Sequence, residues 1–346
     1  MKPGWWLLAL SLSLAVPAQA EVPAARLRIL SKGVNLTTVF TNTPLPTIAG
    51  DLNEIRQAGL HHIRIFIDPD WVLRDATRPG NRLRRGVKAA VANRLGVILC
   101  MSSNSHPMDD KATPAVVARW TQAWRVIART YAHAFPPRMI FFELANEPTM
   151  APPRWNAVQN ALLRTVREAA PDNTILLAGS PYSLAGALAD LNPGNDSNVA
   201  YAVHLYQPMP FTHQGGEWDA RFTAIHDLAY PPDAANIQSA VQGVPPIVRQ
   251  QLEDYEKSGA RAMDAGLDTA KTIADERHWH IVVTEFGVYR AAPAASRARW
   301  LAQARRTIEA DGFGWTVWEF DAGFGIKPDL NGCTDVVRAL GLRCVP

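Results

Sequence analysis

The sequence is poor in cysteine and has no concentration of charge of either sign. Its three cysteines show no CxxC spacing, which argues against a structural zinc site. The formal net charge is only +3 and no block of five or more like charges occurs, so the charge balance does not indicate a nucleic-acid-binding protein. With 19% charged and 47% hydrophobic residues, the chain is too apolar to be disordered.

Long hydrophobic runs are also missing, except at the N-terminus. Residues 5–16 form an apolar run after Lys2, and Ala18-Gln19-Ala20 then supplies the small residues that a signal peptidase accepts. This run of about 12 residues is shorter than the roughly 20 that a membrane-spanning helix needs. We therefore predict that residues 1–20 are a signal peptide and that the protein is secreted or periplasmic. A retained N-terminal anchor is the alternative.

Export permits disulfide bonds. Cys333 and Cys344 flank the C-terminal tail, and we expect a bridge between them that ties down the end of the chain. Cys100 lies in an apolar run, so we expect a buried side chain there rather than a reactive thiol.

Short apolar runs alternate with amphipathic stretches through the rest of the chain. Predicted strands cover residues 29–36, 61–67, 96–101, 139–145, 174–178, 199–206, 281–286 and 314–320. Predicted helices cover residues 47–59, 83–94, 114–134, 154–170, 248–277, 294–311 and 334–340, with a stunted helix near 184–191. Eight strands alternating with helices predict one (β/α)8 barrel over residues 21–346. The alternative, a doubly wound open sheet, usually opens with a Gly-rich nucleotide-binding turn, and Gly33-Val34-Asn35 is not one.

One connection is much longer than the others. Residues 207–246, after the sixth predicted strand, are rich in proline, glycine and aromatic side chains. A connection this long in a compact domain is usually functional or disordered, and its aromatic residues favour an ordered, functional loop.

Charged and aromatic residues gather where the predicted strands end. Catalytic groups of (β/α)8 barrels stand at the carboxyl ends of the strands. Glu147 follows the fourth strand and Glu285 lies at the end of the seventh, nearly opposite across the barrel mouth. Two carboxylates that face one cavity suit cleavage of a glycosidic bond. A single Glu at a strand end is often only solvated or salt-bridged, but Arg64, His204 and Tyr206 are expected to converge on this pair.

Four short motifs carry a resemblance to a known family. They are Asn146-Glu147-Pro148, His204-Leu205-Tyr206, Thr284-Glu285-Phe286-Gly287 and Trp315-Thr316-Val317-Trp318. In this order, each on its own strand, they resemble glycoside hydrolase family 5, the cellulase-like enzymes. The likeness runs from Lys32-Gly33-Val34-Asn35 to Gly323-Phe324-Gly325-Ile326 and so covers nearly all of residues 21–346.

The resemblance implies a division of roles between the two carboxylates. Glu147 resembles the general acid/base and Glu285 the nucleophile of a retaining mechanism, with Asn146 binding the 2-hydroxyl of the sugar. Arg64 is expected beside the nucleophile, where its positive charge favours the ionised form. The carboxylate farther from this arginine is then the one that carries the proton.

The remaining matching positions would support this pair. Tyr206 would orient Glu285 together with the arginine, and His204 would position the acid/base. Trp318 would form the floor under the sugar at the cleavage point.

Three further residues are expected to contact substrate. The family has a histidine directly after the third strand, whereas this chain continues through Ser102 and Ser103; either His106 fills that role from a longer loop or Asn104 replaces it. Trp218 in the long loop and Trp71 are predicted platforms that stack on sugar rings, and packing in the core is the alternative for both.

The resemblance implies a retaining endo-β-1,4-glucanase that acts as a monomer on a β-glucan polysaccharide or oligosaccharide by double displacement. We expect no cofactor, no metal ion, no nucleic-acid partner and no transmembrane segment in the mature chain. Alternatives within the family are an endo-β-1,4-mannanase and a β-1,3-glucan-active hydrolase or transglycosylase. Outside it, the alternatives are a catalytically silent polysaccharide-binding barrel and a metal-dependent hydrolase, although no His-x-His follows the first strand.

Overall fold

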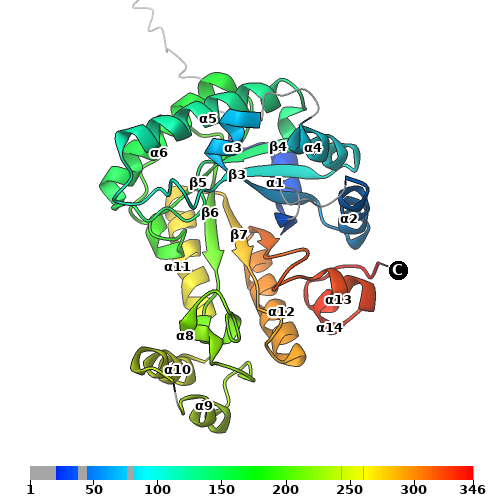
Figure 1. Ribbon diagram of the computed structural model, residues 1–346, viewed down its shortest axis with the longest axis vertical. Coiled ribbons are helices and arrows are strands. Elements are labelled where there is room, and N and C mark those ends of the chain that lie inside the picture. The colour runs from blue at the N-terminus through cyan, green and yellow to red at the C-terminus, as the bar shows by residue number, and fades with distance from the viewer. Residues whose placement is uncertain (1–20, 38–44, 76–80, 243, 260, 346) are drawn as a thin grey trace, which may run out of the picture.

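The computed structural model describes residues 21–37, 45–75, 81–242, 244–259 and 261–345. Eight parallel strands follow one another around a closed barrel, and β8 pairs with β1 to complete it. The strands are β1 (Lys32–Asn35), β2 (His62–Ile67), β3 (Gly96–Met101), β4 (Ile140–Glu143), β5 (Ile175–Ala178), β6 (Val199–Leu205), β7 (Ile281–Phe286) and β8 (Gly314–Val317). The predicted single (β/α)8 barrel is confirmed (Figure 1).

Six long helices cover the outside of the barrel, and all of them overlap predicted helices. They are α2 (Leu45–Ala58), α4 (Arg82–Ala92), α5 (Pro114–Ala132), α6 (Pro152–Ala169), α11 (Arg261–Arg277) and α12 (Ala294–Ala310). The stunted helix after β5 is the 3₁₀ helix η3 (Ala185–Leu188), and the predicted C-terminal helix is α14 (Asp335–Ala339). The short elements that were not predicted include α3 (Pro69–Asp75), η2 (Pro137–Met139) and α13 (Lys327–Gly332).

Two predicted elements differ most from the structure in their extent. The first strand was expected from residue 29, but Leu30 ends helix α1 (Ala24–Leu30) and β1 begins only at Lys32. The single helix expected over 248–277 is two helices, α10 (Pro246–Ser258) and α11. The break occurs at Gly259, whose φ of 56° lies in the left-handed region that ends a helix and that glycine adopts at little cost.

The two faces of each strand pack into different cores. Ile63 and Ile65 of β2 belong to the large core between the barrel and its helices, so Arg64 between them faces the barrel interior. In β4, Phe142 likewise packs outward and Glu143 points inward. The interior near the amino ends of the strands is filled by an apolar cluster of Leu30, Ile98, Phe141, Leu176, Ala200 and Val282. The inward-facing side chains of Arg64 and Glu143 lie above this plug, on the carboxyl side of the barrel.

The long segment after β6 is ordered and partly helical. It contains α7 (Met209–Thr212), α8 (Ala220–Thr223) and α9 (Ala234–Ala240), followed by α10. Phe211, Phe222 and Tyr230 are buried and anchor the segment, whereas Trp218 is 56% exposed. In Figure 1, α8, α9 and α10 lie together at one end of the molecule. The expected loop after the sixth strand is thus a structured extension that carries one exposed tryptophan.

Both predictions about the cysteines are confirmed. Cys333 and Cys344 form a disulfide with their Cα atoms 5.0 Å apart, and Cys100 is buried with a free thiol. The predicted signal peptide, residues 1–20, lies outside the described residues. Within the described ranges, no helix combines the length and apolar character needed to cross a membrane.

Candidate active site

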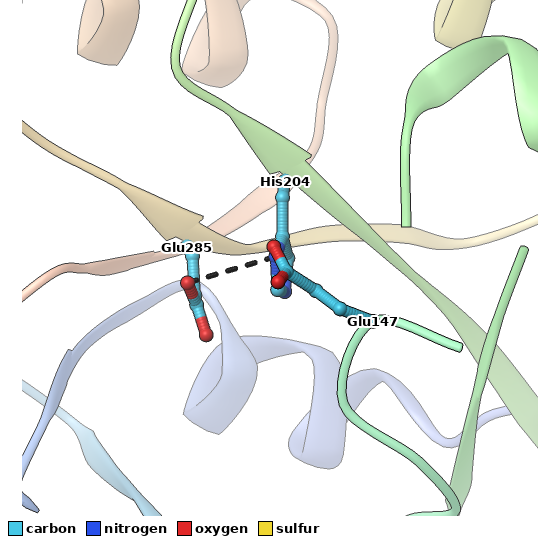
Figure 2. A group of neighbouring side chains, drawn as sticks. All are labelled: Glu147, His204 and Glu285. Atoms are coloured by element: carbon cyan, nitrogen blue, oxygen red, sulfur yellow. Dashed lines mark hydrogen bonds and ion pairs between the residues drawn. The ribbon is translucent and has the colours of Figure 1, made fainter. Parts of the chain in front are cut away.

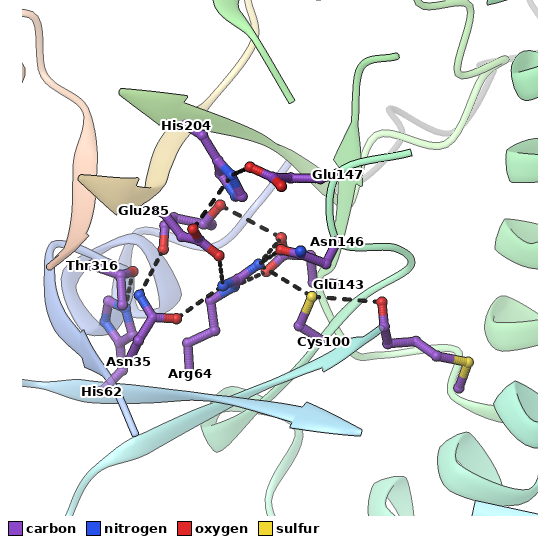
Figure 3. A network of polar contacts seen from close by, with 12 residues as sticks. Asn35, His62, Arg64, Cys100, Glu143, Asn146, Glu147, His204, Glu285 and Thr316 are labelled. Atoms are coloured by element: carbon purple, nitrogen blue, oxygen red, sulfur yellow. Dashed lines mark hydrogen bonds and ion pairs between the residues drawn. The ribbon is translucent and has the colours of Figure 1, made fainter. Parts of the chain in front are cut away.

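Arg64 is the centre of a buried polar network above the apolar plug (Figure 3). Its Nε and Nη2 donate to the two oxygens of Glu143 at 2.6 and 2.9 Å. Its Nη1 donates to Asn35 Oδ1 at 2.9 Å and to Glu285 Oε1 at 2.7 Å. Its Nη2 also donates to Asn146 Oδ1 at 2.8 Å. The side chain is fully buried, so this guanidinium fixes the two carboxylates and two amides around it in one geometry.

Glu285 is held from two sides at the end of β7. Besides the contact with Arg64, its Oε2 accepts a hydrogen bond from the Tyr206 hydroxyl at 2.9 Å. Burial and the neighbouring carboxylate of Glu285 raise the pKa of Tyr206 well above its usual range, so the phenol stays neutral and remains a donor. A charged donor and a neutral donor therefore hold the two oxygens of Glu285 in place. This arrangement suits a nucleophile.

Glu147 lies in a different environment at the end of β4. Its side chain is 37% exposed, against 7% for Glu285, and its backbone adopts a φ of 42° in the left-handed region. Its Oε1 lies 2.8 Å from His204 Nδ1, and the same nitrogen is 3.6 Å from Glu285 Oε2 (Figure 2). Backbone strain at a non-glycine residue is typical of functional sites. An exposed carboxyl on this turn can reach a substrate from above.

Glu147 and His204 shift each other's pKa in opposite directions. Burial would raise the pKa of Glu147, but the hydrogen bond and positive charge of His204, together with Arg64, lower it below its usual value. Burial would lower the pKa of His204, yet the carboxylates of Glu285 and Glu147 raise it. The sequence-based expectation placed the proton on Glu147 alone. The two pKa shifts favour a charged pair in which His204, beside Glu147, holds the proton.

The two candidate catalytic carboxylates are close together. One oxygen of each and a ring nitrogen of His204 all lie within 4.8 Å of one another. Retaining glycosidases have carboxyl groups about 5–5.5 Å apart, and inverting ones about 6.5–9.5 Å. Such a triad could also ligate a metal ion, but Arg64 stands 2.7 Å from Glu285 and would repel a cation there. The geometry suits direct attack and proton transfer better than metal binding.

An open cavity of about 460 Å³ lies over these groups. Trp318 forms part of its wall and packs against Phe66, with ring centroids 5.6 Å apart. Trp218 lies at its rim beside Tyr289. The cavity is lined by Glu147, Tyr206, His213, Trp218, Glu285, Tyr289, Trp318, Glu319, Gly323 and Phe324.

Two of the predicted substrate-binding residues lie elsewhere. His106 Nδ1 is 3.1 Å from Asp70 Oδ2, and its carbonyl oxygen accepts from Trp120 Nε1, so it is held between α3 and α5. Trp71 lines a second cavity of about 540 Å³, together with residues 102–105 that follow β3. Neither side chain lines the cavity over Glu147 and Glu285. The position directly after β3 is occupied by Ser102, and the network does without a histidine there.

Several residues of the site were not among the predicted site residues. Glu143 and Asn35 complete the contacts of Arg64, and Glu319 lines the catalytic cavity. Burial raises the pKa of Glu319, which accepts a hydrogen bond from Thr37 Oγ1 at 3.1 Å. Strand alternation could have found Glu143, because it stands two residues after the inward-facing Phe141.

Comparison with known proteins identifies the family. The model of "Cellulase (glycosyl hydrolase family 5)" matches residues 28–323. Endoglucanase 3 of Fibrobacter succinogenes is 28% identical over 253 residues, which cover 69% of this chain and 38% of that protein. Endoglucanase C of Acetivibrio thermocellus is 24% identical over 78% of this chain and 82% of its own length. A crystal structure of Thermotoga maritima Cel5A with cellobiose superposes with a TM-score of 0.73 at 22% identity, covering 93% of this chain and 99% of that one. The chain belongs to glycosyl hydrolase family 5.

Proposed function

We propose that the protein is a retaining endo-β-1,4-glucanase with Glu285 as nucleophile and Glu147 as general acid/base. The observation that carries the proposal is the spacing of the two carboxylates within 4.8 Å, at the carboxyl ends of β4 and β7 in one open cavity. Their different surroundings support the assignment, because Glu285 contacts a buried guanidinium whereas Glu147 contacts a titratable imidazole.

In the first step, a Glu285 oxygen attacks the anomeric carbon as the bond to the leaving oxygen breaks. That oxygen takes the proton held by Glu147 and His204, and a glycosyl ester forms on Glu285. The guanidinium of Arg64, fixed by Glu143, donates from Nη2 to Asn146 Oδ1. This contact orients the Asn146 side chain and leaves its Nδ2 to donate to the 2-hydroxyl. That hydrogen bond strengthens as the oxocarbenium-like transition state forms.

In the second step, water enters where the leaving group stood. Glu147 takes a proton from the water, whose oxygen attacks the anomeric carbon and releases the Glu285 carboxylate. The pair of Glu147 and His204 thereby regains its proton, and the anomeric configuration of the substrate is retained. Tyr206 donates to Glu285 throughout, because its hydroxyl does not ionise in this environment.

The open cavity and its aromatic walls support a polymeric β-glucan as the substrate. Trp318 lies under the reacting ring, and Trp218 at the rim is exposed enough to stack on a neighbouring ring. We further propose that residues 1–20 are removed on export and that residues 21–346 act as a monomeric secreted or periplasmic enzyme.

The test is reducing-end release from carboxymethyl cellulose, mixed-linkage β-glucan, β-1,3-glucan, glucomannan and mannan, with Glu285→Ala as the control. Preferential release from the β-1,4-glucans, absent in the variant, supports the proposal. NMR of the first products should show the β-anomer before mutarotation. Initial formation of the α-anomer would overturn the retaining mechanism, and preferential release from mannan or β-1,3-glucan would overturn the substrate assignment.

A further inference from the structure

A third carboxylate, Glu143, lies beneath the catalytic pair and takes no part in the chemistry described above. Its side chain is fully buried and stands on β4, four residues before Glu147. Both of its oxygens accept from Arg64, and Thr284 Oγ1 lies 3.5 Å from one of them. A buried carboxylate destabilises the fold unless it is paired with a positive charge and hydrogen-bonded, as Glu143 is here with Arg64.

We propose that Glu143 is a positioning residue that sets the reactivity of the nucleophile, by holding Arg64 in place and by sharing its positive charge with Glu285. The inference rests on the proposed function, in which Glu285 attacks the sugar. It assigns to Glu143 a role in the rate and pH dependence of that attack, beyond its role in folding.

The geometry supports the positioning part. Two parallel hydrogen bonds from Nε and Nη2 fix the plane of the guanidinium, as in other bidentate arginine–carboxylate pairs. That plane determines where Nη1 meets Glu285 and where Nη2 meets Asn146. Asn35 is uncharged and accepts a single hydrogen bond from Arg64, so by itself it cannot fix the plane of the guanidinium as Glu143 does.

The charges support the second part. One guanidinium faces two carboxylates, Glu143 at 2.6 Å and Glu285 at 2.7 Å, and all three groups are buried. When Glu285 becomes an ester it loses its negative charge, and the pair of Arg64 and Glu143 remains neutral. Without the charge of Glu143, the guanidinium would stabilise the free Glu285 carboxylate more than the ester. Glu285 would then be harder to protonate and slower to attack.

The test is Glu143→Gln, which keeps the shape of the side chain and removes its charge. The substrate is an aryl β-cellobioside with a good leaving group, because its cleavage needs little acid catalysis and kcat/KM reports the attack by Glu285. We expect kcat/KM to fall by about 10- to 100-fold, in line with a lost charged hydrogen bond. We also expect the acid limb of the pH profile to move to lower pH.

The matched control is Glu309→Gln, at the other end of the barrel. Glu309 accepts from Trp315 Nε1 at 3.1 Å and pairs with Lys32 at 3.4 Å. This variant is expected to lower the melting temperature and to leave the pH profile unchanged. An acid limb in Glu143→Gln that coincides with that of the wild type would overturn the proposal and leave a purely structural role.

A second variant covers a failure of Glu143→Gln to fold. Glu143→Asp keeps the charge but shortens the side chain by one methylene, so we expect smaller changes in kcat/KM and in the acid limb of the pH profile, in the same direction. A kcat/KM and a pH profile equal to those of the wild type would overturn the proposal. Glu285→Gly, assayed with and without azide, separates the two hypotheses. Activity retained in that variant without azide would overturn the proposed function and this inference with it. Loss that azide restores would confirm the nucleophile, and the Glu143 variants then decide the inference alone.

Discussion

Replacement of His204 by glutamine should change the pH dependence of the enzyme as well as its rate. His204 Nδ1 lies 2.8 Å from Glu147 Oε1, and the ring is buried. The pKa of the imidazole is raised from its usual 6.5 because the carboxylates of Glu285 and Glu147 outweigh the effect of burial. The wild-type pair therefore keeps its proton to a pH above 6.5. In His204→Gln the carboxyl of Glu147 must carry that proton alone.

The size and the sign of the effect follow from this contact. A hydrogen bond to a charged group contributes about 1.5–3 kcal/mol, so its loss lowers kcat/KM by about 10- to 150-fold near neutral pH. Glu147 alone titrates as a carboxyl group, whose usual pKa is 4.5, although burial raises that value. The basic limb of the profile should therefore move to lower pH, and the deficit should shrink as the pH falls towards 5.

The assay is kcat/KM on a soluble oligosaccharide with a poor leaving group, measured between pH 4 and 9. A matched control is His62→Gln, because burial lowers the pKa of His62 to about 4 and the ring is neutral over most of this range. His62 bonds Thr316 Oγ1 at 2.8 Å and stands away from the carboxylates. That variant should keep the basic limb in place. A uniform loss in His204→Gln at every pH would refute the shared-proton interpretation.

Three further predictions concern substrate binding and stability. Asn146→Ala should lower kcat by about 10- to 100-fold with little change in KM, since its contact with the 2-hydroxyl strengthens in the transition state; a 2-deoxy substrate should be insensitive to the substitution. Trp218→Ala should raise KM on soluble β-glucan by about 10-fold, the equivalent of one aromatic stacking contact, and equal KM values would exclude the indole as a platform. The double variant Cys333→Ser/Cys344→Ser should lower the free energy of unfolding by about 3 kcal/mol in urea titrations and leave kcat unchanged at 25 °C, because the bridge closes a loop with a sequence separation of 11.

The barrel could be predicted because its strands and helices have different hydrophobic periods. Strands buried on both faces appear as unbroken apolar runs, such as 96–101 and 281–286, and both are strands with those bounds in the structure. The placement of Glu147 and Glu285 near the strand ends could be predicted for the same reason, since each lies within or shortly after such a run. Residues 259–260 gave no such signal, because one glycine inside an amphipathic stretch is compatible with a continuous helix.

Side-chain partners could not be read from the sequence with the same ease. His106 was predicted to contact substrate from its place after the third strand, but Asp70 and Trp120 hold it beside α3 and α5. In the sequence Glu143 is a single charged residue within a predicted strand. Only the three-dimensional structure shows that both of its oxygens accept hydrogen bonds from Arg64. Contacts between residues 79 positions apart depend on register around the barrel, which no local pattern encodes.

The roles that we propose for the two carboxylates follow from where each stands on the barrel. Glu285 is the end of a strand and is fixed by Arg64 and Tyr206, so its oxygens need little reorganisation to attack one carbon atom. Glu147 stands past the end of β4 on a left-handed turn, where its exposed carboxyl must meet the leaving oxygen first and a water molecule later. A group that is open to the cavity can meet both partners in turn, and a neighbouring group that holds a proton can supply it near neutral pH. In the proposed mechanism His204 is that neighbouring group, because it contacts Glu147 and is also close to the negative charge that would disappear when Glu285 is glycosylated. The loss of that charge lowers the proton affinity of the imidazole at the moment when the leaving group needs the proton.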